Sequence, residues 1–122
     1  MNGLAFPLTT FFFFVSQYVA RNVKNGINAG FFAHPSFVSE DELKAFNVPL
    51  SIAAAETDSI FPTEMRHKSE EILKEKGDPY QINLYSQVEH GFSVRGDMTK
   101  KEVRFAKEQA FIQAVTWFNT WL

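Results

Sequence analysis

The sequence has 122 residues, enough for one small domain or for part of a larger one. Apolar residues make up 45% of it and charged residues 21%, which is the composition of a folded protein and excludes a disordered one. The formal net charge of -2 argues against binding to nucleic acid or to an anionic membrane surface, and the absence of cysteine excludes disulfides and thiolate metal clusters.

The first 16 residues fit no regular element. Pro7 interrupts them, and the phenylalanines at positions 11–14 follow neither a helical period nor a strand alternation. The apolar run is about half as long as a bilayer span requires. A signal peptide carries a basic residue before its apolar run, and none precedes this run. We therefore expect a cytoplasmic protein in which residues 1–16 form an atypical apolar segment.

Helical and strand-like segments alternate after this segment. Apolar periodicity and boundary residues predict helices over residues 15–23, 39–46, 63–76 and 100–122. Short apolar or alternating runs predict strands over residues 27–33, 48–55 and 80–85. Strands that alternate with helices pair in parallel and carry helices on both faces. The sequence therefore predicts an α/β fold.

Two of the predicted helices begin with a serine or threonine followed three residues later by a glutamate. Ser39 with Glu42 and Thr99 with Glu102 both fit a capping box. The last helix carries a broad apolar stripe, made of Val103, Ala106, Ala110, Ala114, Trp117, Phe118 and Trp121. Three strands are too few to bury that stripe, so we expect an incomplete sheet from one end of a larger doubly wound protein.

An acid and a histidine follow two successive predicted strands. Asp58 follows the second strand, and His90 lies in a predicted loop over residues 86–98 that follows the third. The carboxyl ends of parallel strands meet at one sheet edge, and an acid followed by a histidine is the second half of a hydrolase triad. Asp58 could then orient His90 through Nδ1 and leave Nε2 to deprotonate a nucleophile. His34, at another strand end, is the competing histidine, and His67 is expected in solvent.

Three phrases resemble the dienelactone hydrolase family, an α/β-hydrolase branch that usually uses a Cys-Asp-His triad. They cover residues 33–37, 49–62 and 89–97. The resemblance implies that residues 17–122 are the C-terminal portion of such a domain. It also implies that the function is hydrolysis of lactone or carboxylic ester bonds in a small-molecule substrate, without a cofactor.

The same resemblance implies roles for three residues. Asp58 is the expected triad acid and His90 the expected base. Arg95 lies near the position at which the family holds a substrate carboxylate. A surface ion pair of Arg95 with Asp97 or Glu102 is the alternative interpretation.

The nucleophile of the family is missing. Counting back from Gln17, its Gly-x-Cys-x-Gly elbow falls on residues 11–15, with Phe13 at the cysteine position. No Gly-x-Ser-x-Gly sequence occurs, and none of the considered serines has an elbow context: Ser16, Ser36, Ser51, Ser59 and Ser93. We therefore predict that the chain as it stands is inactive.

Three interpretations remain open at this point. The chain is a hydrolase without its nucleophile, an incomplete or misread product of a longer gene, or a non-catalytic interaction module that keeps the C-terminal half of the fold. The spacing of the three histidines predicts no metal site, and no Gly-rich phosphate loop is present. The sequence leaves the oligomeric state open.

Overall fold

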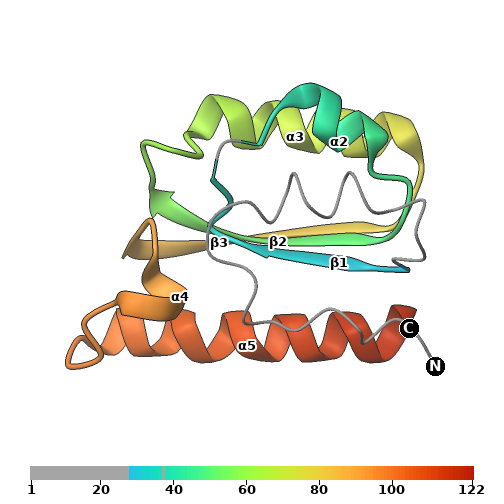
Figure 1. Cartoon of the computed structure of the whole chain (residues 1–122). Coiled ribbons are helices and arrows are strands. Elements are labelled where there is room, and N and C mark those ends of the chain that lie inside the picture. Colours follow the sequence, from blue (N-terminus) through green and yellow to red (C-terminus); the bar gives the residue numbers. More distant parts are fainter. Residues whose placement is uncertain (1–27, 37) are drawn as a thin grey trace.

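The structure, a computed structural model, describes residues 28–36 and 38–122 (Figure 1). The described strands form one parallel sheet in the spatial order β1-β2-β3, with bounds β1 (Gly30–Ala33), β2 (Leu50–Thr57) and β3 (Tyr80–Glu89). Parallel pairing, predicted from the alternation of strands and helices, is confirmed. The predicted helix over residues 15–23 and the apolar segment over residues 1–16 lie outside the described residues.

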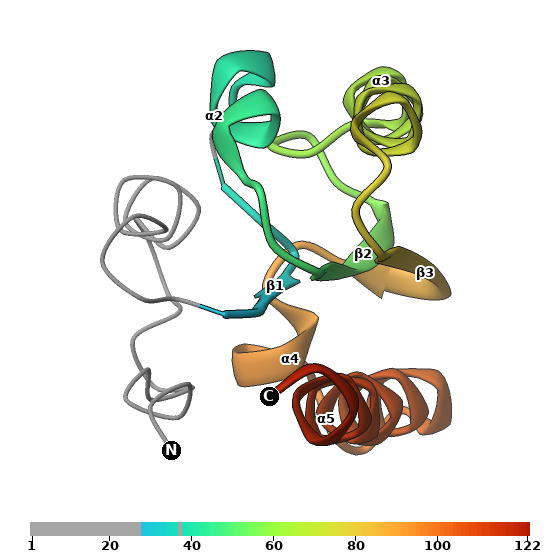
Figure 2. The same cartoon turned by 90° about the vertical axis from the view of Figure 1, so that its right-hand side faces the viewer.

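The helices of the described part form two layers, one on each face of the sheet (Figure 2). One layer contains α2 (Glu40–Ala45) and α3 (Thr63–Lys76), and the other contains α4 (Phe92–Arg95) and α5 (Lys101–Trp121). This sandwich buries the central strand from both sides, as is usual in parallel sheets.

The two faces of β2 build two apolar cores. Ile52 and Ala54 point into the core beneath α2 and α3, and Ala53 and Ala55 point into the core above α5. The first core also holds an edge-to-face pair of Phe32 and Phe46, with ring centroids 5.6 Å apart. Such a pair adds about 1 kcal/mol to the free energy gained by burial.

The predicted ends of α2 and α3 are confirmed. The Ser39 hydroxyl accepts from the Glu42 N–H at 3.1 Å, and the Glu42 carboxylate accepts from the Ser39 N–H at 3.0 Å, which completes the capping box. Helix α3 spans the predicted residues and ends at Gly77, whose φ of +83° suits glycine.

The predicted capping box of the last helix is wrong. Helix α5 has Lys100 at its N-cap, and no side chain caps it. The Thr99 backbone N–H and hydroxyl instead donate to one oxygen of Asp97, at 3.0 and 2.6 Å. A carboxylate two residues earlier competes with the helix for threonine, as Asx turns commonly do.

The predicted loop over residues 86–98 is also wrong in its first half, because β3 continues to Glu89 and α4 follows. Ala55 pairs with Tyr85 whereas Thr57 pairs with Glu89, so β3 accommodates extra residues in an irregular register. Gln87 takes a φ of +62° there, and its N–H donates to the Glu56 carboxylate at 2.8 Å. The Glu56 side chain thus satisfies the Gln87 N–H at the point where the register of the two strands is irregular.

The apolar stripe of α5 is shorter than predicted. Its residues from Val103 to Trp117 are buried, but Trp121 is 39% exposed. Its ring packs on Trp117, four residues earlier, with centroids 5.6 Å apart. In the described part of the chain, no helix is both long and apolar enough to cross a membrane.

Candidate functional site

The site forms where the three strands end. His34 follows β1, Asp58 follows β2 and His90 follows β3, each as the first residue after its strand. Because the strands are parallel, these residues meet at one edge of the sheet, where open α/β proteins build their sites.

Asp58 is fixed by three hydrogen bonds. Its Oδ1 accepts from the backbone N–H groups of Ile60 and Phe61 at 2.8 and 2.9 Å, and its Oδ2 lies 2.8 Å from His90 Nδ1. The Asp58 side chain is only 1% exposed. The carboxylate therefore has one orientation, with one oxygen bound to the backbone and the other facing the imidazole.

The opposite nitrogen of His90 faces a serine. His90 Nε2 lies 3.2 Å from the Ser36 hydroxyl oxygen, so the imidazole is held between Asp58 and Ser36. Gly91 follows with a φ of +90°, a left-handed turn that favours glycine. Ser36 lacks an elbow context, so sequence reasoning alone does not select it as a functional residue. The available signal was its place two residues beyond His34, at the end of a predicted strand.

His34 lies beside this group. Its ring meets the His90 ring edge to face at 5.0 Å, and its Nε2 lies 2.5 Å from the Ser93 hydroxyl oxygen. Burial, and secondarily the nearby His90, lowers the pKa of His34 from 6.5 to about 4. His34 is therefore neutral at pH 7. The exposed His67, on α3, takes no part in the site.

Arg95 lies on α4 with its guanidinium folded over the turn that follows His90. A Cβ placed on Gly91 would come within 2.7 Å of Arg95 Nε. Both residues line a cavity of about 320 Å³ together with His90. Among the described residues, no carboxylate lies within 4.0 Å of the guanidinium, so the structure lacks the ion pair with Asp97 or Glu102.

A model of the Dienelactone hydrolase family matches residues 14–122 of the chain. The chain belongs to this family. "Hydrolase tropI" of Talaromyces stipitatus is 57% identical over 110 residues, which are 89% of this chain and 43% of that protein. "Hydrolase pyvD" of Aspergillus violaceofuscus is 55% identical over 107 residues, which are 87% of this chain and 44% of that protein. The chain thus spans less than half the length of these relatives.

Solved structures agree with the fold of the dienelactone hydrolase family. A structure from Klebsiella pneumoniae described as a dienelactone hydrolase superposes with a TM-score of 0.70 at 15% identity, covering 88% of this chain and 47% of that one. The acylaminoacyl peptidase of Pyrococcus horikoshii gives a TM-score of 0.56 at 14% identity, covering 80% of this chain and 22% of that one. The described sheet is the C-terminal part of an α/β-hydrolase fold.

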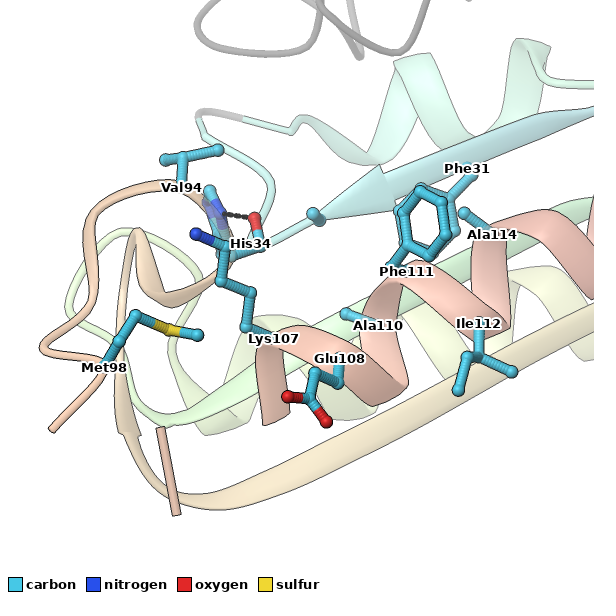
Figure 3. Close-up of a pocket in the computed structure, with 12 residues that line it drawn as sticks. Phe31, His34, Val94, Met98, Lys107, Glu108, Ala110, Phe111, Ile112 and Ala114 are labelled. Atoms are coloured by element: carbon cyan, nitrogen blue, oxygen red, sulfur yellow. Dashed lines mark hydrogen bonds between the residues drawn. The ribbon is translucent and has the colours of Figure 1, made fainter. Parts of the chain in front are cut away.

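A larger, apolar cavity of about 540 Å³ opens beside His34 in this member of the family (Figure 3). It lies between the end of β1, α4 and α5, and Figure 3 marks the hydrogen bond of His34 to the serine hydroxyl at one end. Phe31 and Phe111 line its wall. Such walls suit an apolar part of a small ligand.

Phe13, the position at which the family's cysteine is expected, lies outside the described residues. Within the two described ranges, no three His, Cys, Asp or Glu side chains cluster as a metal site requires.

Proposed function

We propose that the chain carries the acid–base half of a hydrolase site for lactone or carboxylic ester bonds of small molecules. The observation that carries the proposal is the 2.8 Å contact of Asp58 with His90 Nδ1, made by a carboxylate that two backbone N–H groups already fix. Membership of the dienelactone hydrolase family supports the reaction class.

The proposed roles follow from this geometry. Asp58 holds the tautomer of His90 that carries the proton on Nδ1 and stabilises the imidazolium once it forms. His90 Nε2 takes the proton of a nucleophile and returns it to the leaving oxygen. Because His34 is neutral at pH 7, it does not oppose the positive charge on His90.

Arg95 is the proposed partner of a substrate carboxylate. Its exposed guanidinium lies beside the His90 turn. A guanidinium can bind a carboxylate through two parallel hydrogen bonds. The substrate in this proposal therefore carries a carboxylate near the bond that is hydrolysed.

We also propose that the chain alone does not turn over unactivated lactones or alkyl esters. A nucleophile elbow joins a strand directly to a helix and so provides backbone donors for the oxyanion. Ser36, the serine that faces His90, lacks such a strand-to-helix junction, because the first described helix after it begins only at Glu40. The loss of one oxyanion donor slows catalysis by about 10²–10³.

The acid–base pair is tested through the imidazole protons of the full chain. In NMR spectra of protein labelled with ¹⁵N-histidine, we expect a downfield Nδ1–H resonance from His90. Asp58→Ala removes its acceptor, and Asp58→Asn offers an amide donor that forces the proton to Nε2, so the resonance disappears in both variants. Asp97→Asn, a change at an exposed carboxylate, keeps it. Survival of the resonance in Asp58→Ala would contradict the proposed role of Asp58.

The substrate class is tested in the same spectra by titration with a small lactone carboxylate. We expect shifts at His90 but not at the exposed His67, and Arg95→Gln should weaken the response by about tenfold, which corresponds to about 1.4 kcal/mol. An unchanged His90 at saturating lactone would exclude this substrate class. Steady-state hydrolysis that purifies with the chain and vanishes in His90→Ala would overturn the proposed inactivity.

A non-catalytic interaction module is the second candidate function. The observation that favours it is the exposed apolar surface of α5, where Phe111 is 61% and Ile112 51% exposed. Size-exclusion chromatography distinguishes the candidates, because a stable monodisperse species supports a module and aggregation contradicts it. A cytoplasmic location and the division of the chain at residues 16 and 17 remain predictions.

A further inference from the structure

We infer that Ser36 is an acyl acceptor, the nucleophile that the Asp58–His90 pair activates in this chain. The inference rests on the proposed function, because it uses the same pair. It adds a residue that lies in the loop after β1 rather than at an elbow, and it assigns the chain a serine chemistry where its family usually uses a thiolate.

The geometry is that of a nucleophile, a base and an orienting acid in a row. The Ser36 hydroxyl oxygen lies 3.2 Å from His90 Nε2, and His90 Nδ1 lies 2.8 Å from Asp58. A nucleophile within hydrogen-bond reach of a base that a third group orients is the signature of covalent catalysis. The three residues come from the loops after β1, β2 and β3, so the sheet edge itself aligns them.

The structure offers a matched comparison in the second serine–histidine pair. Ser93 lies 2.5 Å from His34 Nε2, a closer contact than that of Ser36 with His90. Among the described hydrogen bonds, however, no carboxylate orients His34. Its pKa of about 4, lowered by burial, makes it a weak base at neutral pH. The shorter distance favours Ser93 as the nucleophile, whereas the carboxylate-oriented base favours Ser36.

The acylation step balances as an ordinary acyl transfer. A lone pair of the Ser36 oxygen forms a bond to the carbonyl carbon of an activated ester, and the hydroxyl proton moves to His90 Nε2. The bond to the leaving oxygen then breaks, and that oxygen takes the electron pair and receives the proton from His90. The products are an ester on Ser36 and a free alcohol. With a fluorophosphonate, phosphorus replaces the carbonyl carbon and fluoride leaves.

This step does not require turnover of ordinary substrates. A fluorophosphonate is strongly activated, so it reacts with a serine that lacks the oxyanion donors an unactivated lactone needs. The adduct is stable, so one reaction per chain is enough to detect it. The inference is therefore compatible with the inactivity proposed above.

The experiment treats the full chain with a fluorophosphonate and locates the adduct by peptide mass spectrometry. We expect one adduct on Ser36, none in Ser36→Ala, and a rate lowered by about 10² or more in His90→Ala, since a general base contributes that factor. Ser93→Ala is the matched control and should react within about twofold of the wild-type rate, as expected when a residue makes no contribution to the transition state. An adduct on another residue, or an equal rate in Ser36→Ala, overturns the inference.

A second pair of variants keeps the test valid if Ser36→Ala unfolds. The chain has no cysteine, so Ser36→Cys and Ser93→Cys each introduce a single thiol. Because His90 with its carboxylate promotes the thiolate, we expect iodoacetamide to alkylate Ser36→Cys at least about tenfold faster than Ser93→Cys, and His90→Ala to remove the difference. Equal rates in the two variants overturn the inference.

The outcome also separates this inference from the function on which it rests. If the Nδ1–H resonance of His90 depends on Asp58 but Ser36 is not labelled, the acid–base pair stands and the role of Ser36 is excluded. If the resonance is also absent, both the proposed function and the inference are excluded.

Discussion

The Asp58 side chain is held both by its own segment and by a distant one. Asp58 receives two hydrogen bonds from the turn that follows it and a third from His90, which is 32 residues away in the sequence. A buried polar group costs free energy unless its hydrogen bonds are satisfied, and these three partners satisfy both oxygens of Asp58. This explains how an almost inaccessible acid can sit at the edge of an apolar core.

His34 leads to a prediction about pH. Burial lowers its pKa from 6.5 to about 4, so between these values the unfolded chain binds a proton that the folded chain does not. The free energy of unfolding should therefore fall as the pH falls from 6.5 toward 4, with a slope on the order of 1 kcal/mol per pH unit. Urea unfolding at pH 7 and pH 5 measures it.

The control for this prediction is the exposed His67. His34→Gln should reduce the loss of stability between pH 7 and pH 5, because the buried group no longer has to take up a proton. His67→Gln should leave the loss unchanged. A loss of the same size in His34→Gln and in the wild type contradicts the assignment to His34.

At the scale of elements, helix ends depend on which acceptor is nearest. The sequence presents the same pattern at Ser39 and at Thr99, yet only Ser39 caps a helix. The difference is Asp97, which binds the Thr99 N–H and hydroxyl before the helix begins. No comparable carboxylate precedes Ser39 within the part of the chain that the structure describes.

The two sites make a matched pair of variants. Ser39→Ala removes the acceptor of the Glu42 N–H and should lower the free energy of unfolding by about 1 kcal/mol. Thr99→Ala loses only an exposed hydrogen bond and should cost less than about 0.5 kcal/mol. Urea unfolding curves of the two variants measure the difference. Equal losses would mean that the Ser39 box adds nothing beyond a surface contact.

At the scale of the whole molecule, a buried polar network joins α5 to the sheet. The Gln113 amide donates to the Ser51 hydroxyl at 2.8 Å and to the Ile52 carbonyl at 3.1 Å, and it accepts from the Tyr85 hydroxyl at 2.7 Å. Ser51 in turn donates to Gln81 at 3.0 Å. One side chain of α5 thus contacts both the central and the edge strand.

Replacement of Gln113 by an apolar side chain should therefore lower the free energy of unfolding. Gln113→Leu leaves the Ile52 carbonyl and the Tyr85 hydroxyl without this partner, and we expect a loss of about 2–4 kcal/mol from the penalties for unsatisfied groups. The exposed Thr116→Ala, one turn away on α5, should change stability by less than about 0.5 kcal/mol. Chemical denaturation checks both values. A Gln113→Leu variant as stable as the wild type would show that the network adds no net stability.

Much of the fold could be predicted because its signals are local. Apolar periodicity and Gly77 gave the bounds of α3, and short apolar runs gave the core of each strand. Gln113 could not be recognised as buried, since its partners on β2 and β3 lie 28 to 62 residues earlier in the sequence. The extension of β3 past Tyr85 likewise depends on its pairing with Thr57.

For the site, the sequence by itself determined the order of the chemistry: an acid after the second strand and a histidine after the third, both at one sheet edge because parallel strands end together. Only the tertiary structure decided which groups touch. Ser36 and His90 are 54 residues apart and follow two strands, β1 and β3, that β2 separates, so no local pattern encodes their contact. Their distance depends on the twist of the sheet and the rotamers of two side chains, which packing against both layers fixes.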